Sequence, residues 1–378
     1  MDTDTTPQTS ARLGRLLRFA EQDPANLNLL SEAAIAAYED RAFDTAASLI
    51  ERHAAQAPLP PRLTNLVGLI ALSRNRFSEA ITAFQQLHDQ GNSAPPLRFN
   101  LAWSKAMTDA YQEALDLLDD ETLSASPSAP ALKIQMMHHL GLYDEGLACG
   151  QQLVERFPDN EALMGSLATL SLDAEQPELA QAYAERAGQN PEGSAALGIL
   201  ALGEQDVGRS LALFDQAIAK QPGNPRAWVG KGLSLLILGN GVAGAEAIDR
   251  GAEIFDTHLG SWIASGWAHF VNGDYKKARA SFERALATDP NFSESHGGLA
   301  VLDIMEGKLD DARRNSEIAL RLDKKCFGGA LAKSLLLERS GHSQMAQKVR
   351  DIALSIPVGP NGQTIAQALV GFNNGLRK

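Results

Sequence analysis

The sequence predicts an all-α protein built from about ten helix pairs, and three observations support this prediction. A set of residues recurs every 34 positions, so that Trp262 steps back to Trp228 and Gly273 steps forward to Gly307. Small residues fall where two helices must touch, with large apolar residues around them. No alternating apolar run is bounded by turn residues, and the Ala, Leu, Glu and Gln content favours helix. Such an array predicts one continuous, elongated unit whose repeats contact only their neighbours.

The stretch from Leu259 to Phe292 shows the pattern most clearly. Its first helix is expected over roughly 261–271 and ends at a turn signal, Asn272-Gly273-Asp274. Its second is expected over roughly 275–287 and ends at Asp289-Pro290, because proline cannot continue a helix. The small residues are Gly266, Ala278 and Ala285, and the large ones are Trp262, Tyr275, Phe282 and Leu286.

This order of Trp, Gly, Tyr, Ala, Phe, Ala and Pro resembles the tetratricopeptide repeat, whose period is 34 residues. In this residue pattern the chain resembles stand-alone tetratricopeptide repeat proteins of the bacterial type. The resemblance implies a right-handed α-α superhelical solenoid of about ten helix-turn-helix repeats with capping helices at both ends. It also implies the general activity of the family, which is binding other proteins.

The repeats are expected to start near residues 27, 61, 95, 127, 161, 191, 225, 259, 293 and 327, which makes 27–356 the array. The units at 95, 127 and 161 are irregular, and the first of them ends in a loop at 124–130. Residues 1–26 are predicted to form a tail and a capping helix. Residues 357–378 are predicted to form a loop and a short capping helix at 365–372, because the ends of a solenoid must be covered.

The sequence contains none of the common catalytic motifs. GxxxxGK[ST], HExxH, GxSxG and a GxGxxG after a strand are all absent. The two cysteines, Cys149 and Cys326, are far apart and lack CxxC spacing. His138 and His139 are adjacent, so on a helix their side chains diverge and do not share a metal ion easily. We therefore expect no enzyme, no catalytic residues, no cofactor and no metal site.

Charge is unevenly distributed along the chain, whose formal net charge is −12. Residues 1–190 hold 13 Lys and Arg against 26 Asp and Glu, whereas the remainder holds 21 against 20. An acidic surface repels a phosphate backbone, so nucleic acid is not an expected partner. Solubility alone and steering of a basic partner both stay open as roles for the acidic half.

The first ten residues lack a basic n-region and an apolar core, so they do not resemble a secretory signal. No apolar run approaches the ~20 residues that a membrane span needs. The expected protein is therefore cytoplasmic, without membrane insertion, and homo-oligomerisation stays open.

In tetratricopeptide arrays the first helix of each repeat lines a concave groove, and the resemblance implies which residues line it here. In the C-terminal half they are almost entirely apolar: Leu233, Leu236, Ile237, Ile263, Trp267, Phe270, Val301, Ile304, Met305 and Leu335. In the middle of the chain the corresponding residues are mixed in polarity and include Phe99 and Trp103. The alternative is that several of these side chains touch the next repeat and are core, as for Leu236. The family's clamp for terminal carboxylates is not expected, because Asn65 is present but the required lysines are missing.

Two classes of function fit these features. In the first, the protein is a non-catalytic interaction scaffold or chaperone-like adaptor that holds an apolar or amphipathic segment of a partner protein in its groove. In the second, it is an accessory or regulatory subunit of an enzyme or of a secretion or assembly machine, and it docks through its convex face or its ends. Loss of the partner in groove variants would distinguish the first from the second.

The repeat at 225–258 is rich in glycine. Gly244 and Gly251 stand where the family has alanine at its helix crossings. A glycine inside a helix costs roughly 0.5–1 kcal/mol relative to alanine. Closer helix packing that recovers part of this loss and a flexible joint are both compatible with the sequence.

Overall fold

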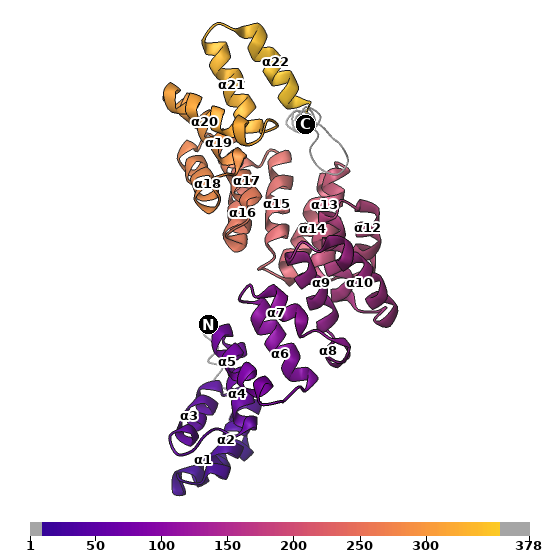
Figure 1. Cartoon of the computed structure of the whole chain (residues 1–378), viewed down its shortest axis with the longest axis vertical. Helices are drawn as coiled ribbons and strands as arrows, with labels where there is room; N and C mark the ends of the chain where they lie inside the picture. Colours follow the sequence, from indigo (N-terminus) through magenta and orange to yellow (C-terminus); the bar gives the residue numbers. More distant parts are fainter. Residues whose placement is uncertain (1–9, 356–378) are drawn as a thin grey trace. The chain divides into compact units, whose positions relative to one another are not determined.

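The structure, a computed structural model, describes residues 10–355, and every regular element within that range is an α-helix (Figure 1). The predicted fold class, an array of helix pairs, is confirmed. The short capping helix expected at 365–372 lies outside the described residues. The chain divides into two compact units, Met1–Pro158 and Asp159–Lys378, and not into the single continuous unit that the sequence predicts. The boundary falls among the irregular repeats.

The first unit contains ten helices in the described residues. They are α1 (Ala11–Gln22), α2 (Leu27–Glu39), α3 (Phe43–Ala54), α4 (Pro61–Ser73), α5 (Phe77–Asp89), α6 (Pro95–Ala106), α7 (Tyr111–Asp116), α8 (Asp120–Ala125), α9 (Ala129–His139) and α10 (Tyr143–Arg156).

The second unit contains twelve helices in the residues that the structure describes. They are α11 (Glu161–Asp173), α12 (Pro177–Arg186), α13 (Pro191–Gly203), α14 (Val207–Lys220), α15 (Pro225–Ile237), α16 (Gly241–Phe255), α17 (Leu259–Val271), α18 (Tyr275–Thr288), α19 (Ser293–Met305), α20 (Leu309–Leu322), α21 (Phe327–Arg339) and α22 (Ser343–Leu354).

The repeat that starts at Pro95 departs from the helix pair that the sequence predicts. Its second helix is replaced by two helices of six residues each, α7 and α8. The break is explained by Asp119, whose side chain accepts a hydrogen bond from the backbone N–H of Thr122 and so begins a new helix. The helix that follows, α9, begins at Ala129 instead of near residue 127.

A left-handed residue ends the first helix of nearly every repeat and turns the chain into the second helix. In the repeats that start at 127, 225, 259, 293 and 327 this residue is glycine, for example Gly273 with φ 77°. In the other repeats it is not, and residues such as Asn75 (φ 56°) and Glu175 (φ 55°) adopt the same conformation at a steric cost. Gly273 N–H donates to the Phe270 carbonyl, and Asp274 N–H donates to that of His269. These bonds satisfy carbonyls that the helix end would otherwise leave open.

Phenylalanine side chains from the second helices fill the core of the repeats. Phe282 is completely buried, because its ring lies between Gly266 of its own repeat and Gly298 of the next. A Cβ added to Gly266 would lie 2.3 Å from this ring, and one added to Gly298 would lie 2.6 Å from it. Phe214 lies in the same way between Gly198 and Gly230. The small and large residues of the sequence pattern therefore meet as predicted.

The glycine-rich repeat is closely packed. A Cβ on Gly244 would lie 2.8 Å from Leu236 Cγ and 2.9 Å from the Gly232 carbonyl oxygen. A Cβ on Gly251 would lie 2.8 Å from the Pro225 carbonyl oxygen. The backbones of α15 and α16 thus approach more closely than alanine would allow. This geometry favours close packing over a flexible joint as the role of these glycines.

Candidate protein-binding strip

Five of the residues predicted to line a groove recur at one position of the repeat. Trp103, Leu233, Trp267, Val301 and Leu335 are each the ninth residue of a first helix, namely α6, α15, α17, α19 and α21. The structure does not expose them equally. Trp103 is 36% exposed, Val301 is fully buried, and the other three lie between these extremes.

Three of the predicted lining residues belong to the core. Val301 and Ile304 pack with Trp267 and Phe270 of the preceding first helix and with Leu335 of the following one, and Ile263 packs in the neighbouring cluster. Val301 and Ile304 are 0% and 1% exposed. Consecutive first helices contact each other, so a side chain directed at the next repeat has no surface left for a partner. For these three residues, the assignment to the groove surface is corrected to core.

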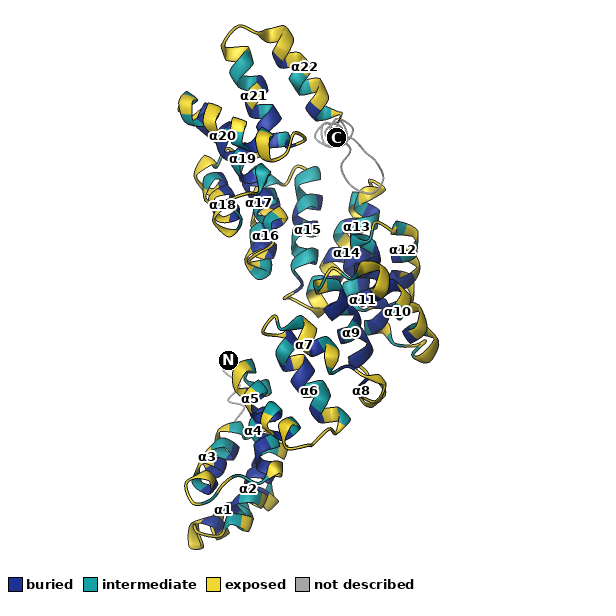
Figure 2. Cartoon of the chain, in the orientation of Figure 1, coloured by how far each residue is buried: buried dark blue, intermediate teal, exposed yellow. Residues whose placement is uncertain are grey.

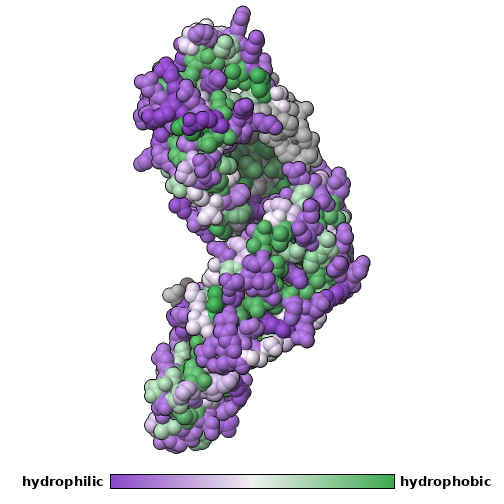
Figure 3. Space-filling view, viewed as in Figure 1, coloured by the Kyte–Doolittle hydropathy of each residue, from purple (hydrophilic) through white to green (hydrophobic). Residues whose placement is uncertain are grey.

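The remaining predicted residues of the second unit keep part of their surface open, and we call them the apolar strip: Leu233, Leu236, Ile237, Trp267, Phe270, Met305 and Leu335. Met305 is the most exposed of them, at 45%. Most residues of α15 are half-buried (Figure 2). Hydrophobic residues gather around this helix, in a hollowed part of the unit (Figure 3). Soluble proteins seldom expose such surface unless something binds it.

Trp267 is both part of the strip and part of the core. Its ring meets the rings of Phe270, Phe282 and Phe327 edge-on, at centroid distances of 5.6, 5.4 and 5.9 Å. Edge-to-face contacts of this kind are favourable for aromatic rings. Trp267 therefore packs against three aromatic rings while part of its surface stays exposed.

In the first unit the predicted residues form a separate aromatic patch on α6. Phe99 and Trp103 lie one turn apart, with ring centroids 6.3 Å from each other. Met107 follows after one more turn and is 44% exposed. This face of α6 therefore keeps apolar surface open, and its role in binding stays a prediction.

One polar cluster in the described residues of the second unit differs from a serine–histidine catalytic arrangement. Ser265, Asp249 and His269 lie together, but the serine hydroxyl donates to Asp249 (2.6 Å), and His269 Nε2 also contacts that carboxylate (2.8 Å). A catalytic serine needs its hydroxyl on the histidine instead. Among the described residues, no group of three His, Cys, Asp or Glu side chains is placed to hold a metal ion.

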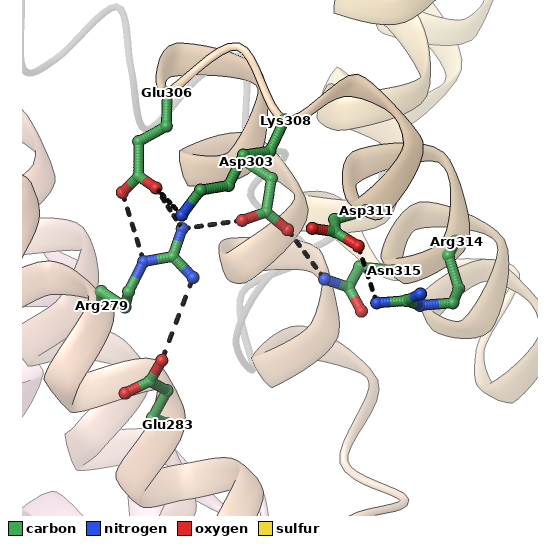
Figure 4. Close-up of polar contacts among 8 residues, drawn as sticks. All are labelled: Arg279, Glu283, Asp303, Glu306, Lys308, Asp311, Arg314 and Asn315. Carbon is green, nitrogen blue, oxygen red and sulfur yellow. Dashed lines mark hydrogen bonds and ion pairs between the residues drawn. The ribbon is translucent and has the colours of Figure 1, made fainter.

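A second polar cluster joins α18, α19 and α20 (Figure 4). The buried Asp303 carboxylate accepts hydrogen bonds from Arg279 Nη2 at 2.7 Å and from Asn315 Nδ2 at 2.9 Å. Arg279 also contacts Glu306. A hydrogen bond from Lys308, together with the charge of Arg279, holds the pKa of Glu306 below its ordinary value despite partial burial. The carboxylates of Asp303 and Glu306 are therefore both paired with cations. These contacts connect three successive helices.

Two family models with the same description, tetratricopeptide repeat, match the chain. One matches residues 270–314, and the other matches residues 31–95, 68–130 and 195–257. Together with the helix pairs described above, these matches show that the chain belongs to the tetratricopeptide repeat family.

A curated relative and several solved structures are also similar to the chain. The heat-shock protein cognate co-chaperone sgt12 of Aspergillus fumigatus is 22% identical over 160 residues, which are 42% of this chain. The chain spans only 45% of the length of that relative. The human IFIT1 dimer with PPP-AAAA matches the whole chain at 15% identity and a TM-score of 0.55. That match covers 95% of the IFIT1 chain. The human IFIT1 dimer with m7Gppp-AAAA is 14% identical with a TM-score of 0.52, and its match covers 94% of this chain and 95% of the IFIT1 chain. At this identity the likeness shows the fold alone.

The structure also bears on membrane contact. None of the helices in the described range 10–355 is long and apolar enough to cross a bilayer.

Proposed function

We propose that this tetratricopeptide repeat protein is a non-catalytic adaptor that holds an apolar or amphipathic segment of a partner protein on the apolar strip. The observation that carries the proposal is the partial exposure of large apolar side chains on four successive first helices of one unit. A helical segment with anchors at every third or fourth residue fits such a row of side chains, because helix-in-groove recognition uses a few buried apolar anchors.

The co-chaperone relative favours a chaperone-like role and a cytoplasmic setting. Binding of a terminal carboxylate is not proposed. Of the residues that form the family's clamp, this sequence has Asn65 but lacks the required lysines. The ligand of the strip is therefore an internal apolar segment. The aromatic patch of Phe99 and Trp103 is proposed to have the same kind of role in its own unit.

Nucleic acid is not the proposed ligand. The IFIT1 structures contain m7Gppp-AAAA or PPP-AAAA, but IFIT1 shares only the fold with this chain. The chain has 46 acidic against 34 basic residues, a balance that repels phosphate.

A photo-crosslinking amino acid in place of Met305 tests the proposal. Val242 of the second helix α16 is the control position, because it is also an exposed apolar residue (68%) but lies outside the strip. In extracts of the source cell, the Met305 position should crosslink to one partner that the Val242 position does not reach. Equal crosslinking from both positions, or crosslinking from Val242 alone, would instead support a subunit that docks through its ends or its convex face.

A further inference from the structure

A cavity with a volume of about 470 Å³ lies between α20 and α21, and none of its lining residues belongs to the apolar strip. Its lining combines three half-buried leucines, Leu320, Leu336 and Leu337, with three cations, Arg313, Arg321 and Lys333. We call it the α20–α21 groove. Sequence reasoning missed it, because its residues do not lie on the face that the family resemblance marks as concave.

The cations of the groove are only partly neutralised. Arg313 forms an ion pair with Asp310 at 2.8 Å. Within the described part of the chain, Arg321 and Lys333 form no ion pair, and Glu317 is the single acidic residue of the lining. The lining therefore keeps an excess of positive charge beside an apolar floor.

The dimensions suit a short helical segment. Arg313 and Arg321 are eight residues apart on α20, which is about 12 Å along the helix axis. A ligand helix of about two turns would span the same distance. Its apolar side would contact the leucines, and acidic side chains along its edges would reach Arg321 and Lys333.

We propose that the α20–α21 groove binds an acidic amphipathic helical segment of a partner protein. The argument is charge complementarity: a lining with three cations, one carboxylate and three leucines matches carboxylates beside apolar side chains. The chain's own end does not have this chemistry, since residues 356–378 contain no Asp or Glu and finish with Arg377 and Lys378.

The test uses the full chain and a fluorescein-labelled helical peptide of 16 residues, with leucines along one side and glutamates along both edges. Fluorescence anisotropy measures its affinity for wild type and for the double variant Arg321→Glu, Lys333→Glu. The control double variant is Lys324→Glu, Lys325→Glu, which makes the same change of charge in the exposed loop between α20 and α21. Circular dichroism confirms that all three proteins are folded.

The groove variant should bind the peptide about tenfold more weakly or worse, because two attractive charge pairs become repulsive. The control variant should bind within about twofold of wild type. Three results would overturn the proposal: equal weakening in both variants, equal binding of a peptide with lysine in place of each glutamate, or equal competition by a single-stranded oligonucleotide. The last of these would assign the groove to phosphate, and concentration-dependent self-association abolished by the groove variant would assign it to a second copy of this chain.

Discussion

Arg226 at the start of α15 binds the Asp173 carboxylate at the end of α11 through two hydrogen bonds, of 3.1 and 2.5 Å. The two residues are 53 positions apart in the sequence. The first helix of another repeat, α13, lies between α11 and α15 along the chain. Solenoid repeats usually contact only their neighbours. Here an ion pair connects the first helices of alternate repeats within the second unit.

This pair should stabilise the fold measurably. Both side chains are about one third exposed, at 31% and 28%, so the pair lies between a surface ion pair and a buried one. A double-mutant cycle with Arg226→Ala and Asp173→Ala should give a coupling free energy of about 1 kcal/mol in urea unfolding. Single-variant effects that simply add would show that the two side chains do not interact in solution.

Gly244→Ala should destabilise the protein by about 1–3 kcal/mol, because the added methyl group would overlap Leu236 and the Gly232 carbonyl. Gly14 of α1 is the matched control, since a Cβ there meets nothing within 4 Å. Gly14→Ala should stabilise by about 0.5–1 kcal/mol. Thermal unfolding of both variants decides the question. Stabilisation by Gly244→Ala would restore the flexible-joint interpretation, as would hydrogen exchange in 225–258 that is faster than in every other regular repeat.

Stability should fall in alkaline solution, partly through Cys326. Burial, reinforced by the charge of Glu294, raises the pKa of this thiol from 9.0 to about 12. The folded state thus keeps its proton up to about pH 12, whereas the unfolded chain loses it near pH 9. The contribution of Cys326 to stability is therefore complete below pH 9 and is lost between pH 9 and 12. The melting temperature of wild type should fall more between pH 8.5 and 10.5 than that of Cys326→Ala. Parallel curves would contradict this.

The residues after α22 should cover that helix. Met345, Val349 and Ile352 lie along one face of α22, and Met345 and Ile352 are 56% and 67% exposed. Ile365, Leu369 and Phe372 repeat the same spacing in the sequence that follows. Deletion of 358–378 should therefore speed hydrogen exchange in α21 and α22 without changing partner affinity. Serine at Ile365, Leu369 and Phe372 should have the same effect at full length. Tighter partner binding after deletion would instead mean that this segment occupies the apolar strip.

The sequence predicts the architecture well, because the architecture depends on residues that repeat. Gly266 and Phe282 are recognisable as a contact from their spacing alone, and the structure places the glycine against the ring. The sequence fails where a local signal interrupts the period. Asp119 begins a helix of its own, so that repeat has three helices, and only the capping preference of aspartate could have indicated it.

The binding surface was harder to predict than the fold. Val301 and Leu335 hold the same position of the repeat, yet Val301 is buried between two first helices and Leu335 is half-exposed. Which of them faces solvent depends on how closely neighbouring helices approach, and this distance is set by packing across repeats. Periodicity identifies a face of the helix, but it does not say how much of that face the next repeat covers.

The central claim is that the apolar strip binds an apolar or amphipathic segment. Trp267→Ala should cost on the order of 2–4 kcal/mol of binding, but it also removes core contacts, so Met305→Glu is the cleaner variant. The most direct measurement is isothermal titration of the crosslinked partner's segment into wild type, Met305→Glu and the control Val242→Glu, at low and high salt. We predict binding that is about tenfold to a hundredfold weaker in Met305→Glu, unchanged in Val242→Glu and retained at high salt. Normal binding by Met305→Glu, or loss of wild-type binding at high salt, would contradict the claim and point to the acidic surfaces of the chain as the interface.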